Sequence, residues 1–229
     1  MTTDTKFIAE VRNVKEVLLV ASADLAFWQA KLGQEGLFPF NNDGQAELTI
    51  SATELTWMGR RTNELTVGIA VCARPHADSR DGLFLVHAFT SSRLFAWIER
   101  TAFHTPYYYG RIQVRDQLPC SMQLGDASGR LVDIRMTTTP NLNFASEEMW
   151  QGTIYLPRGR SAAHRPAPYF VAKLGGATEV YPYVPAASVL DLAPRREHPV
   201  FQWLLASNLA GREWHIRHAA VHARSKTTT

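Results

Sequence analysis

Apolar and polar residues alternate along much of this chain, a pattern typical of strands with one buried face. In the stretch 64–73, bulky residues from Leu65 to Val71 occupy every second position, and small residues such as Gly68 and Ala70 lie between them. A face of small residues allows another part of the molecule to approach the strand closely. Further strands are predicted at 14–20, 47–58, 83–90, 108–115, 118–124, 131–138 and 214–222, with weaker ones at 150–156, 169–174 and 180–184.

Two segments near the ends of the chain change to a helical pattern. The first follows Ser22 or Asp24, either of which can cap its first turn, and ends near Gly33. The second covers residues 199–208 and precedes the last predicted strand.

The strongest helical pattern covers residues 93–104, after a possible cap at Ser92. Phe95, Ile98 and Ala102 form an apolar stripe along it, and we expect the helix to pack through this stripe. Pro106 follows and prevents its continuation.

With about ten strands, two or three helices and connections of hairpin length, the chain is predicted to be a β-dominated α+β protein. A single large antiparallel sheet that closes, or nearly closes, into a barrel would remove the exposed edges of so many strands. The helices are then peripheral to the barrel. We expect one domain over residues 1–229, with residues 1–6 and 224–229 as disordered tails.

The composition agrees with a globular chain and narrows its partners. Of 229 residues, 45% are hydrophobic and 20% are charged, and the net charge of +3 is spread along the sequence. Nucleic-acid binding normally needs a basic stripe, so no nucleic-acid partner is expected. No apolar run approaches the roughly 18 residues of a membrane span, and no secretory signal follows Met1, so no membrane association is expected.

Sequence motifs give little support to cofactor chemistry. Cys72 and Cys120 match no C-x-x-C spacing, which favours a reducing, cytoplasmic location. The chain has no phosphate-binding loop, dinucleotide fingerprint or G-x-S-x-G serine motif. His215, His218 and His222 would line one side of a helix, but the alternation around them favours a strand, in which only His218 and His222 share a face. We therefore expect neither a metal ion nor another cofactor.

The segment from Glu64 to Val114 has a distinctive order of features. An acidic strand that contains Glu64 precedes an aromatic strand, a helix and the tripeptide Pro106-Tyr107-Tyr108. This order resembles the uncharacterised bacterial DUF2071 family, in the acetoacetate decarboxylase-like superfamily. The resemblance implies a largely antiparallel, single-domain barrel or cone around a small-molecule cavity, which agrees with the strand pattern.

Acetoacetate decarboxylases are similar in layout but carry Pro-Lys-Lys after the helix, and their first lysine forms a Schiff base with the keto acid. The resemblance places Tyr107 and Tyr108 at the two lysine positions and Glu64 at the acidic position of that family. The family's substrate-binding arginine falls on Ser22. Because tyrosine cannot form an imine, Schiff-base decarboxylation is not expected here.

The residue types at these positions still suit carbonyl chemistry. The phenol of Tyr107 or Tyr108 can polarise a carbonyl group or stabilise an enolate. Glu64, if it is desolvated in a cavity, can act as the acid or base that moves the proton. Adjacent strand residues face opposite ways, so only one tyrosine points inward, and we expect Tyr108, which shares a face with Gly110.

Three further residues complete the predicted site as ligand-binding groups. His87 lies on the strand next to Glu64, and Arg111 and Arg135 each alternate with apolar neighbours. An alternative interpretation is that Glu64 forms an ion pair with Arg111 or Arg135 inside the barrel and has only a structural role.

The sequence therefore indicates a protein for a small organic ligand or substrate. One hypothesis is a lyase, hydratase or cyclase without a Schiff base, acting on a carbonyl or β-keto compound. The competing hypothesis is a non-catalytic protein that binds an apolar or aromatic small molecule, and a third is an oligomer-building protein. A homo-oligomer is compatible with each. The segment 156–168, with three prolines, three arginines and one histidine, is either a surface loop or a lid for an anionic ligand.

Overall fold

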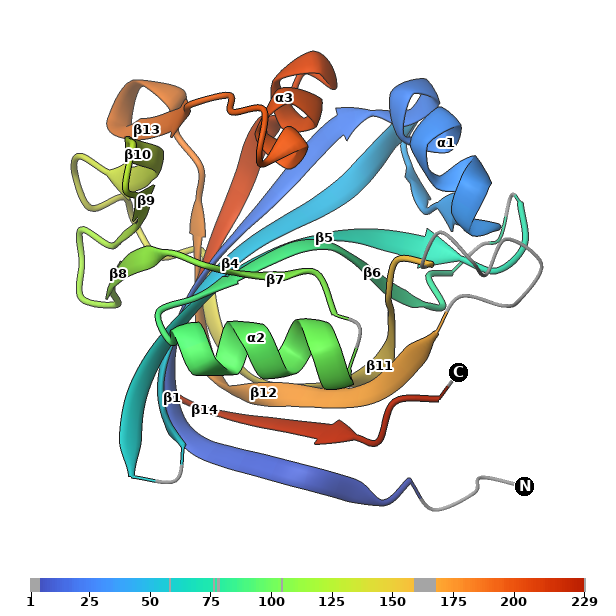
Figure 1. Ribbon diagram of the computed structural model, residues 1–229. Helices are drawn as coiled ribbons and strands as arrows, with labels where there is room; N and C mark the ends of the chain where they lie inside the picture. The colour runs from blue at the N-terminus through green and yellow to red at the C-terminus, as the bar shows by residue number, and fades with distance from the viewer. Residues whose placement is uncertain are drawn as a thin grey trace.

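A computed structural model describes residues 5–57, 59–75, 77, 79–103, 105–158 and 168–228 (Figure 1). Most of the segment 156–168, predicted as a loop or lid, lies outside these residues. In the part of the chain that the structure describes, strands dominate and three α-helices accompany them. The β-dominated α+β class is therefore confirmed.

The strands form a larger and a smaller sheet, so the expectation of a single sheet is wrong. The larger sheet contains β1 (Phe7–Asp24), β2 (Phe38–Pro39), β4 (Gln45–Trp57), β5 (Arg60–Cys72), β6 (Gly82–Thr90), β7 (Tyr107–Tyr109), β11 (Phe144–Tyr155), β12 (Tyr169–Pro182) and β14 (Ala210–Ser225), with the short β3 (Asn41–Asn42) beside β4. The smaller sheet contains β8 (Arg111–Arg115), β9 (Ser121–Asp126), β10 (Gly129–Met136) and β13 (Ser188–Leu192). The helices are α1 (Leu25–Leu32), α2 (Arg93–Ala102) and α3 (Pro199–Ala206), and single 3₁₀ turns cover Gly33–Glu35 and Pro185–Ala187.

The larger sheet closes on itself. Its strands follow the order β5–β4–β1–β14–β12–β11–β6, and β6 pairs again with β5, so the hydrogen-bonded path forms a ring (Figure 1). The expectation of a purely antiparallel sheet is wrong, because β6 runs parallel to both β11 and β7. Between β6 and β7 the reason is the crossover through α2, which returns the chain to the sheet in the same direction.

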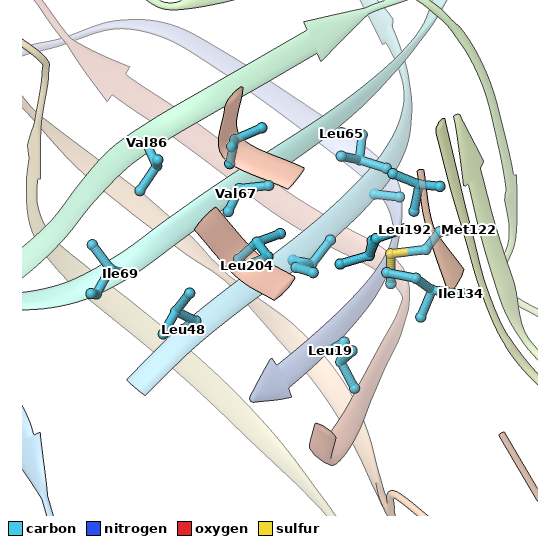
Figure 2. Close-up of a cluster of buried hydrophobic side chains, with 14 of the residues drawn as sticks. Leu19, Leu48, Leu65, Val67, Ile69, Val86, Met122, Ile134, Leu192 and Leu204 are labelled. Carbon is cyan, nitrogen blue, oxygen red and sulfur yellow. The ribbon is translucent and has the colours of Figure 1, made fainter. Parts of the chain in front are cut away.

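The alternation predicted from the sequence places one face of the ring against the main core. In register across four strands, Leu65, Ala52, Val17 and Ile216 are all buried on this core face. Figure 2 shows the same cluster, where side chains of the ring meet those of the smaller sheet and of α3. The ring, the smaller sheet and the helices α1 and α3 thus share one apolar core.

The helix caps follow the sequence signals, and the packing of α2 follows them in part, because Phe95 and Ile98 are half-buried. Asp24 Oδ1 accepts from the N–H of the third residue of α1 (2.6 Å), and Ser92 Oγ accepts from the corresponding N–H of α2 (3.2 Å). Ala102 was expected to pack inward, yet it is exposed, and α2 buries Ala96 and Glu99 instead. The burial of Glu99, with an exposed fraction of 2%, depends on an arginine of β14 described below.

The C-terminal residues are not a disordered tail. Arg224 and Ser225 belong to β14, and Thr228 exchanges two backbone hydrogen bonds with Tyr169 (2.7 and 2.9 Å). The backbone polar groups of this end thereby find partners on β12. Residues 1–4 and 229, also predicted as tails, lie outside the described residues, and β1 begins at Phe7. Among the helices that the structure describes, none is long and apolar enough to cross a membrane.

Because one core joins the two sheets, we expect a single cooperative unfolding transition in denaturant. Near-ultraviolet circular dichroism reports the packing of the aromatic core, and far-ultraviolet circular dichroism reports the strands. The two signals should change together. Two separated transitions would contradict the prediction that residues 1–229 form one domain.

Candidate functional site

A row of polar side chains crosses the ring on the face opposite the main core. Strand register places Glu64 of β5 beside Thr53 of β4, Thr53 beside Glu16 of β1, and Glu16 beside Arg217 of β14. Thr53, Glu16 and Arg217 have exposed fractions of only 6, 4 and 9%. We call the face that carries this row the polar face.

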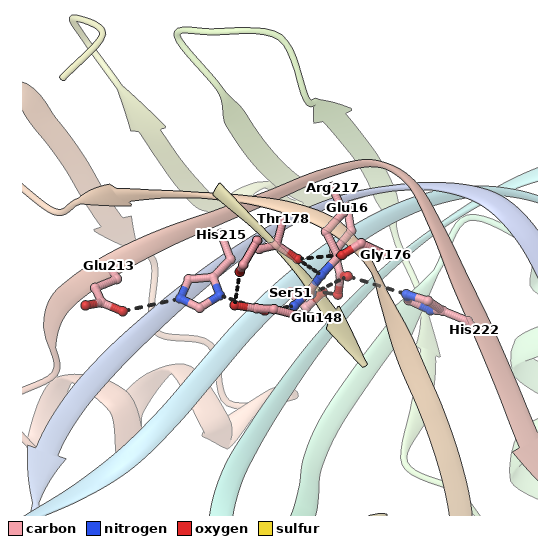
Figure 3. Close-up of polar contacts among 10 residues, drawn as sticks. Glu16, Ser51, Glu148, Gly176, Thr178, Glu213, His215, Arg217 and His222 are labelled. Atoms are coloured by element: carbon pink, nitrogen blue, oxygen red, sulfur yellow. Dashed lines mark hydrogen bonds and ion pairs between the residues drawn. The ribbon is translucent and has the colours of Figure 1, made fainter. Parts of the chain in front are cut away.

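Arg217 is the centre of the row's hydrogen bonds (Figure 3). Its guanidinium donates from Nε to Thr178 Oγ1 (2.7 Å), from Nη1 to Glu16 Oε2 (2.9 Å) and from Nη2 to Glu148 Oε2 (2.8 Å). These partners lie on β12, β1 and β11, so one side chain of β14 joins three other strands. The two carboxylates raise the pKa of Arg217 despite its burial.

Glu16 is buried and ionised within this network. Burial alone would raise its pKa, but the charges and hydrogen bonds of His222 and Arg217 hold the pKa of Glu16 well below its usual range. His222 Nε2 lies 3.4 Å from Glu16 Oε2, and Ser51 Oγ donates to Glu16 Oε1 (2.8 Å). His215 extends the same group toward Glu148, at 3.9 Å (Figure 3).

Glu64 differs from Glu16 because its partner is neutral. Tyr107 Oη donates to Glu64 Oε2 at 3.0 Å, and among the described residues Glu64 forms this hydrogen bond and no ion pair. Burial raises the pKa of Glu64 to about 7; the charge of Glu99 adds to the rise, while the Tyr107 hydrogen bond, His222 and Arg224 oppose it. Both Glu64 and Tyr107 keep a little accessible surface.

The phenol of Tyr107 stays protonated at neutral pH. Burial and the charges of Glu64 and Glu99 raise its pKa well above the ordinary value. The ring of Phe95, on α2, meets the Tyr107 ring edge to face with centroids 5.7 Å apart. Helix α2 therefore covers this part of the polar face.

Glu99 and Arg224 form a second buried ion pair beside Tyr107. Arg224 Nη1 lies 3.1 and 3.3 Å from the two carboxylate oxygens of Glu99, and Thr105 Oγ1 donates to Glu99 Oε2 (2.7 Å). The guanidinium lies over the rings of Phe103 (5.3 Å) and Phe170 (4.3 Å). Because Thr105 stands two residues before Tyr107, Glu99 ties both the end of α2 and the start of β7 to β14.

Tyr108 does not face Glu64, contrary to our expectation. It pairs with Phe89 in register and points to the core face, where its ring stacks on His87 with centroids 4.5 Å apart and an angle of 9°. The residue that shares the face of Glu64 is Tyr107. The preference for Tyr108 rested on its spacing from Gly110, but β7 ends at Tyr109, so the two do not belong to one continuous strand.

His87 also belongs to the core face rather than to the polar face. Its Nε2 lies 3.3 Å from His198 Nδ1, at the start of α3. Burial, and secondarily the neighbouring His198, lower the pKa of His87 to about 3. His87 is therefore a neutral, packed histidine at physiological pH.

Arg111 and Arg135 do not reach Glu64. Both lie on the smaller sheet, where Arg111 is exposed and donates to the backbone carbonyl of Asp126, and Arg135 binds the carboxylate of Asp133. The alternative in which either arginine neutralises Glu64 is therefore wrong. The sequence pattern of their strands, β8 and β10, is the same as that of the strands in the ring. Only the hydrogen-bonded pairing in the structure assigns β8 and β10 to the smaller sheet.

Sequence reasoning missed most of the ionisable groups of the polar face. Glu16 gave a usable signal, because it is a charged residue within the apolar stretch 14–20. Glu99 and Arg224 gave none, since the first looked like the solvent side of an amphipathic helix and the second lay in an expected tail. No group of three or more His, Cys, Asp or Glu side chains among the described residues is arranged to hold a metal ion.

Two surface hollows lie away from Glu64 and Tyr107. One of about 420 Å³ is lined by residues of β11, β12 and β14, including Thr178 and His218. Another of about 380 Å³ lies between α1, β6 and α3, next to Trp28 and Trp203. Neither contains the residues with the strongest acid–base character, and we place the candidate site on the polar face for that chemical reason.

Comparison with solved structures identifies the fold. The chain is similar to the enduracididine biosynthesis enzyme MppR, complexed with the condensation product of pyruvate and imidazole 4-carboxaldehyde (TM-score 0.62, 9% identity, 99% of this chain and 91% of that chain). It is similar to an acetoacetate decarboxylase (TM-score 0.62, 13% identity, 97% and 90%) and to that of Legionella pneumophila (TM-score 0.66, 10% identity, 99% and 90%). These similarities show an acetoacetate decarboxylase-like fold. No family model and no curated protein matches the sequence.

Arg217→Ala should destabilise the protein by about 3–5 kcal/mol, because it leaves the buried carboxylate of Glu16 without its cation. Urea unfolding measures the change. Arg12→Ala serves as the control, since its ion pair with Glu10 is largely solvent-exposed (75% and 45%) and should be worth less than about 1 kcal/mol. Equal effects of the two substitutions would contradict the role given to Arg217.

Glu64→Gln should change the pH dependence of stability in a defined direction. The pKa of Glu64 is higher in the folded chain (about 7) than its ordinary value of 4.5. The ionised carboxylate therefore destabilises the fold increasingly as the pH rises from 4.5 through about 7. Above this range we expect Glu64→Gln to be more stable than the unmodified protein by about 1–3 kcal/mol, and below it the two should be alike. Constant differences in unfolding free energy across this range would refute the raised pKa.

Proposed function

We propose that this chain is an enzyme that acts on a carbonyl compound, with Glu64 as the group that moves the proton and Tyr107 as the donor to the carbonyl oxygen. The observation that carries the proposal is the hydrogen bond from Tyr107 Oη to Glu64 Oε2 at 3.0 Å, between two half-buried side chains, with no ion pair of Glu64 among the described residues. The acetoacetate decarboxylase-like fold supports it.

The pKa of Glu64 suits acid–base catalysis. A pKa of about 7 leaves both protonation states populated near neutral pH, which is where a general acid or base is most effective. As a base, the Glu64 carboxylate takes a proton from the carbon next to the carbonyl: the C–H bond breaks, an O–H bond forms on Glu64, and the electron pair moves to the carbonyl oxygen. Once protonated, Glu64 is a weaker acceptor, so the Tyr107 O–H becomes available to the new enolate oxygen.

An enolate formed in this way can lead to lyase, hydratase or cyclase chemistry. The proposal needs no amine nucleophile, which agrees with tyrosine at the two positions where acetoacetate decarboxylases carry lysine. A cytoplasmic location, a homo-oligomer and a specific link to the DUF2071 family remain predictions from the sequence.

A second candidate function is ligand binding without turnover. A small cluster of Leu85, Ala88, Ile154, Leu156 and Ala172 supports half-buried Leu83, Tyr107, Trp150, Phe170 and Leu174. This apolar and aromatic surface next to Glu64 would hold an apolar or aromatic small molecule whether or not a proton moves.

Deuterium exchange at the carbon next to a carbonyl distinguishes the two functions. We expect the protein to accelerate exchange of ketone protons in D2O, measured by NMR, and Glu64→Gln to reduce the rate by about 10²–10⁴. The rate should rise with pH through about 7, because the carboxylate is the active form. Glu147→Gln is the matched control. Glu147 also lies on a strand of the ring but is exposed, so this variant should keep the exchange rate of the unmodified protein. Exchange that is unaffected by Glu64→Gln would refute the role of Glu64.

Reduction with borohydride in the presence of acetoacetate should leave no covalent adduct on the protein, as judged by mass spectrometry. Tyr107 cannot form an imine. Lys173, on β12, alternates with Ala172 and Leu174 and so points away from the face that packs with Tyr107. A trapped adduct on Lys173 would contradict the proposed chemistry.

A further inference from the structure

We infer, on the basis of the proposed function, that the substrate is an uncharged ketone or aldehyde with an apolar or aromatic body, and not a keto acid. The inference rests on how the charged groups around Glu64 are already paired and on the apolar side chains beside them. Both features select against a carboxylate on the substrate.

The cations of this cluster, among the side chains that the structure describes, already lie beside carboxylates. Arg217 binds Glu16 and Glu148, and Arg224 binds Glu99. His222 is already next to Glu16. A substrate carboxylate placed at Glu64 would therefore find no unpaired cation among these side chains and would lie beside the carboxyl group of Glu64 itself.

The charge of Arg217 is already balanced by protein carboxylates. Its Nε, Nη1 and Nη2 all donate to protein oxygens, on Thr178, Glu16 and Glu148. A bidentate contact with a carboxylate needs two adjacent N–H groups that point toward it. An incoming carboxylate would compete with Glu16 and Glu148 for this one cation, and a displaced Glu16 would be left buried without it.

Arg224 is similarly occupied. Nη1 binds both oxygens of Glu99, Nη2 donates to Thr227 Oγ1 (3.4 Å), and the guanidinium lies over the rings of Phe103 and Phe170. Its Nε is closed to solvent and has no hydrogen-bond partner among the described residues. The charge of Arg224 is thus used to bury Glu99.

Apolar side chains also lie around Tyr107. Leu83, Trp150, Phe170 and Leu174 are half-buried and pack with Tyr107 against the same small cluster. Such side chains favour an apolar or aromatic body by removing its surface from water. A neutral carbonyl would then accept from Tyr107 while its apolar part lies on these side chains.

Phenylacetone and phenylpyruvate form a matched pair of probes, since they share a benzyl ketone and differ in a methyl group against a carboxylate. Dissociation constants from NMR chemical-shift titration report binding, and exchange of the benzylic protons in D2O reports proton transfer. We expect phenylacetone to bind at least about tenfold more tightly, because phenylpyruvate carries the disfavoured charge.

Glu99→Gln removes one of the acidic charges and loosens the hold on Arg224, so it should move the ratio of the two dissociation constants toward phenylpyruvate by about tenfold. Glu147→Gln should leave the ratio unchanged. If Glu99→Gln only distorted the site, both probes would bind more weakly and the ratio of their dissociation constants would not change.

The binding and exchange results separate the two claims. Equal or tighter binding of phenylpyruvate, or binding of neither probe, would overturn the inference about charge. Selective binding of phenylacetone without exchange above the buffer rate would support the inference about charge and overturn the proposed enzymatic function in favour of ligand binding. Exchange of phenylpyruvate that depends on Glu64 would overturn the inference and leave the proposed function standing.

Discussion

The buried guanidinium of Arg217 is the interaction on which the polar face depends. A cation can be removed from water only if its donors are satisfied and its charge is balanced. Arg217 meets both conditions with Thr178, Glu16 and Glu148, which lie on three different strands of the ring. The same bonds that stabilise the charge hold β1, β11, β12 and β14 together around it.

This pairing also explains why Glu64 differs chemically from Glu16. The two carboxylates lie on the same face, separated in register by Thr53 alone. Glu16 has Arg217 and His222, which keep its pKa low, whereas Glu64 has the phenol of Tyr107 and a raised pKa of about 7. Two carboxylates whose surroundings push their pKa values apart are a recurrent arrangement in acid–base catalysis. Here one supports the structure, and the other is available to exchange a proton.

Much of the fold could be predicted from the sequence, because alternation depends only on local spacing. The apolar positions of β4 and β5, the caps at Asp24 and Ser92, and Glu64 as a residue of interest were all readable from the chain. The sequence identified Tyr107 and Tyr108 as candidates. To choose between them, one must know which way each side chain points from β7, a strand of only three residues. Local spacing does not determine that direction.

The charged groups around Glu64 could not be predicted, because they come from distant segments. Glu99 and Arg224 are far apart in the chain, and each is ordinary in its local sequence. Arg111 and Arg135 alternated with apolar residues as a ring residue would, but their strands pair in the other sheet. Strand pairing between distant segments, which the sequence pattern leaves open, decides which charges meet.

The ionisation of Glu64 is the most direct test of this account. The difference infrared spectrum between the unmodified protein and Glu64→Gln isolates the carbonyl stretch of the protonated Glu64 carboxyl, which can be followed during a pH titration. We predict that this band disappears with a midpoint at about pH 7. A midpoint at the ordinary glutamate value of 4.5 would show that Glu64 is a solvated carboxylate, and the account of the polar face as an acid–base site would be wrong.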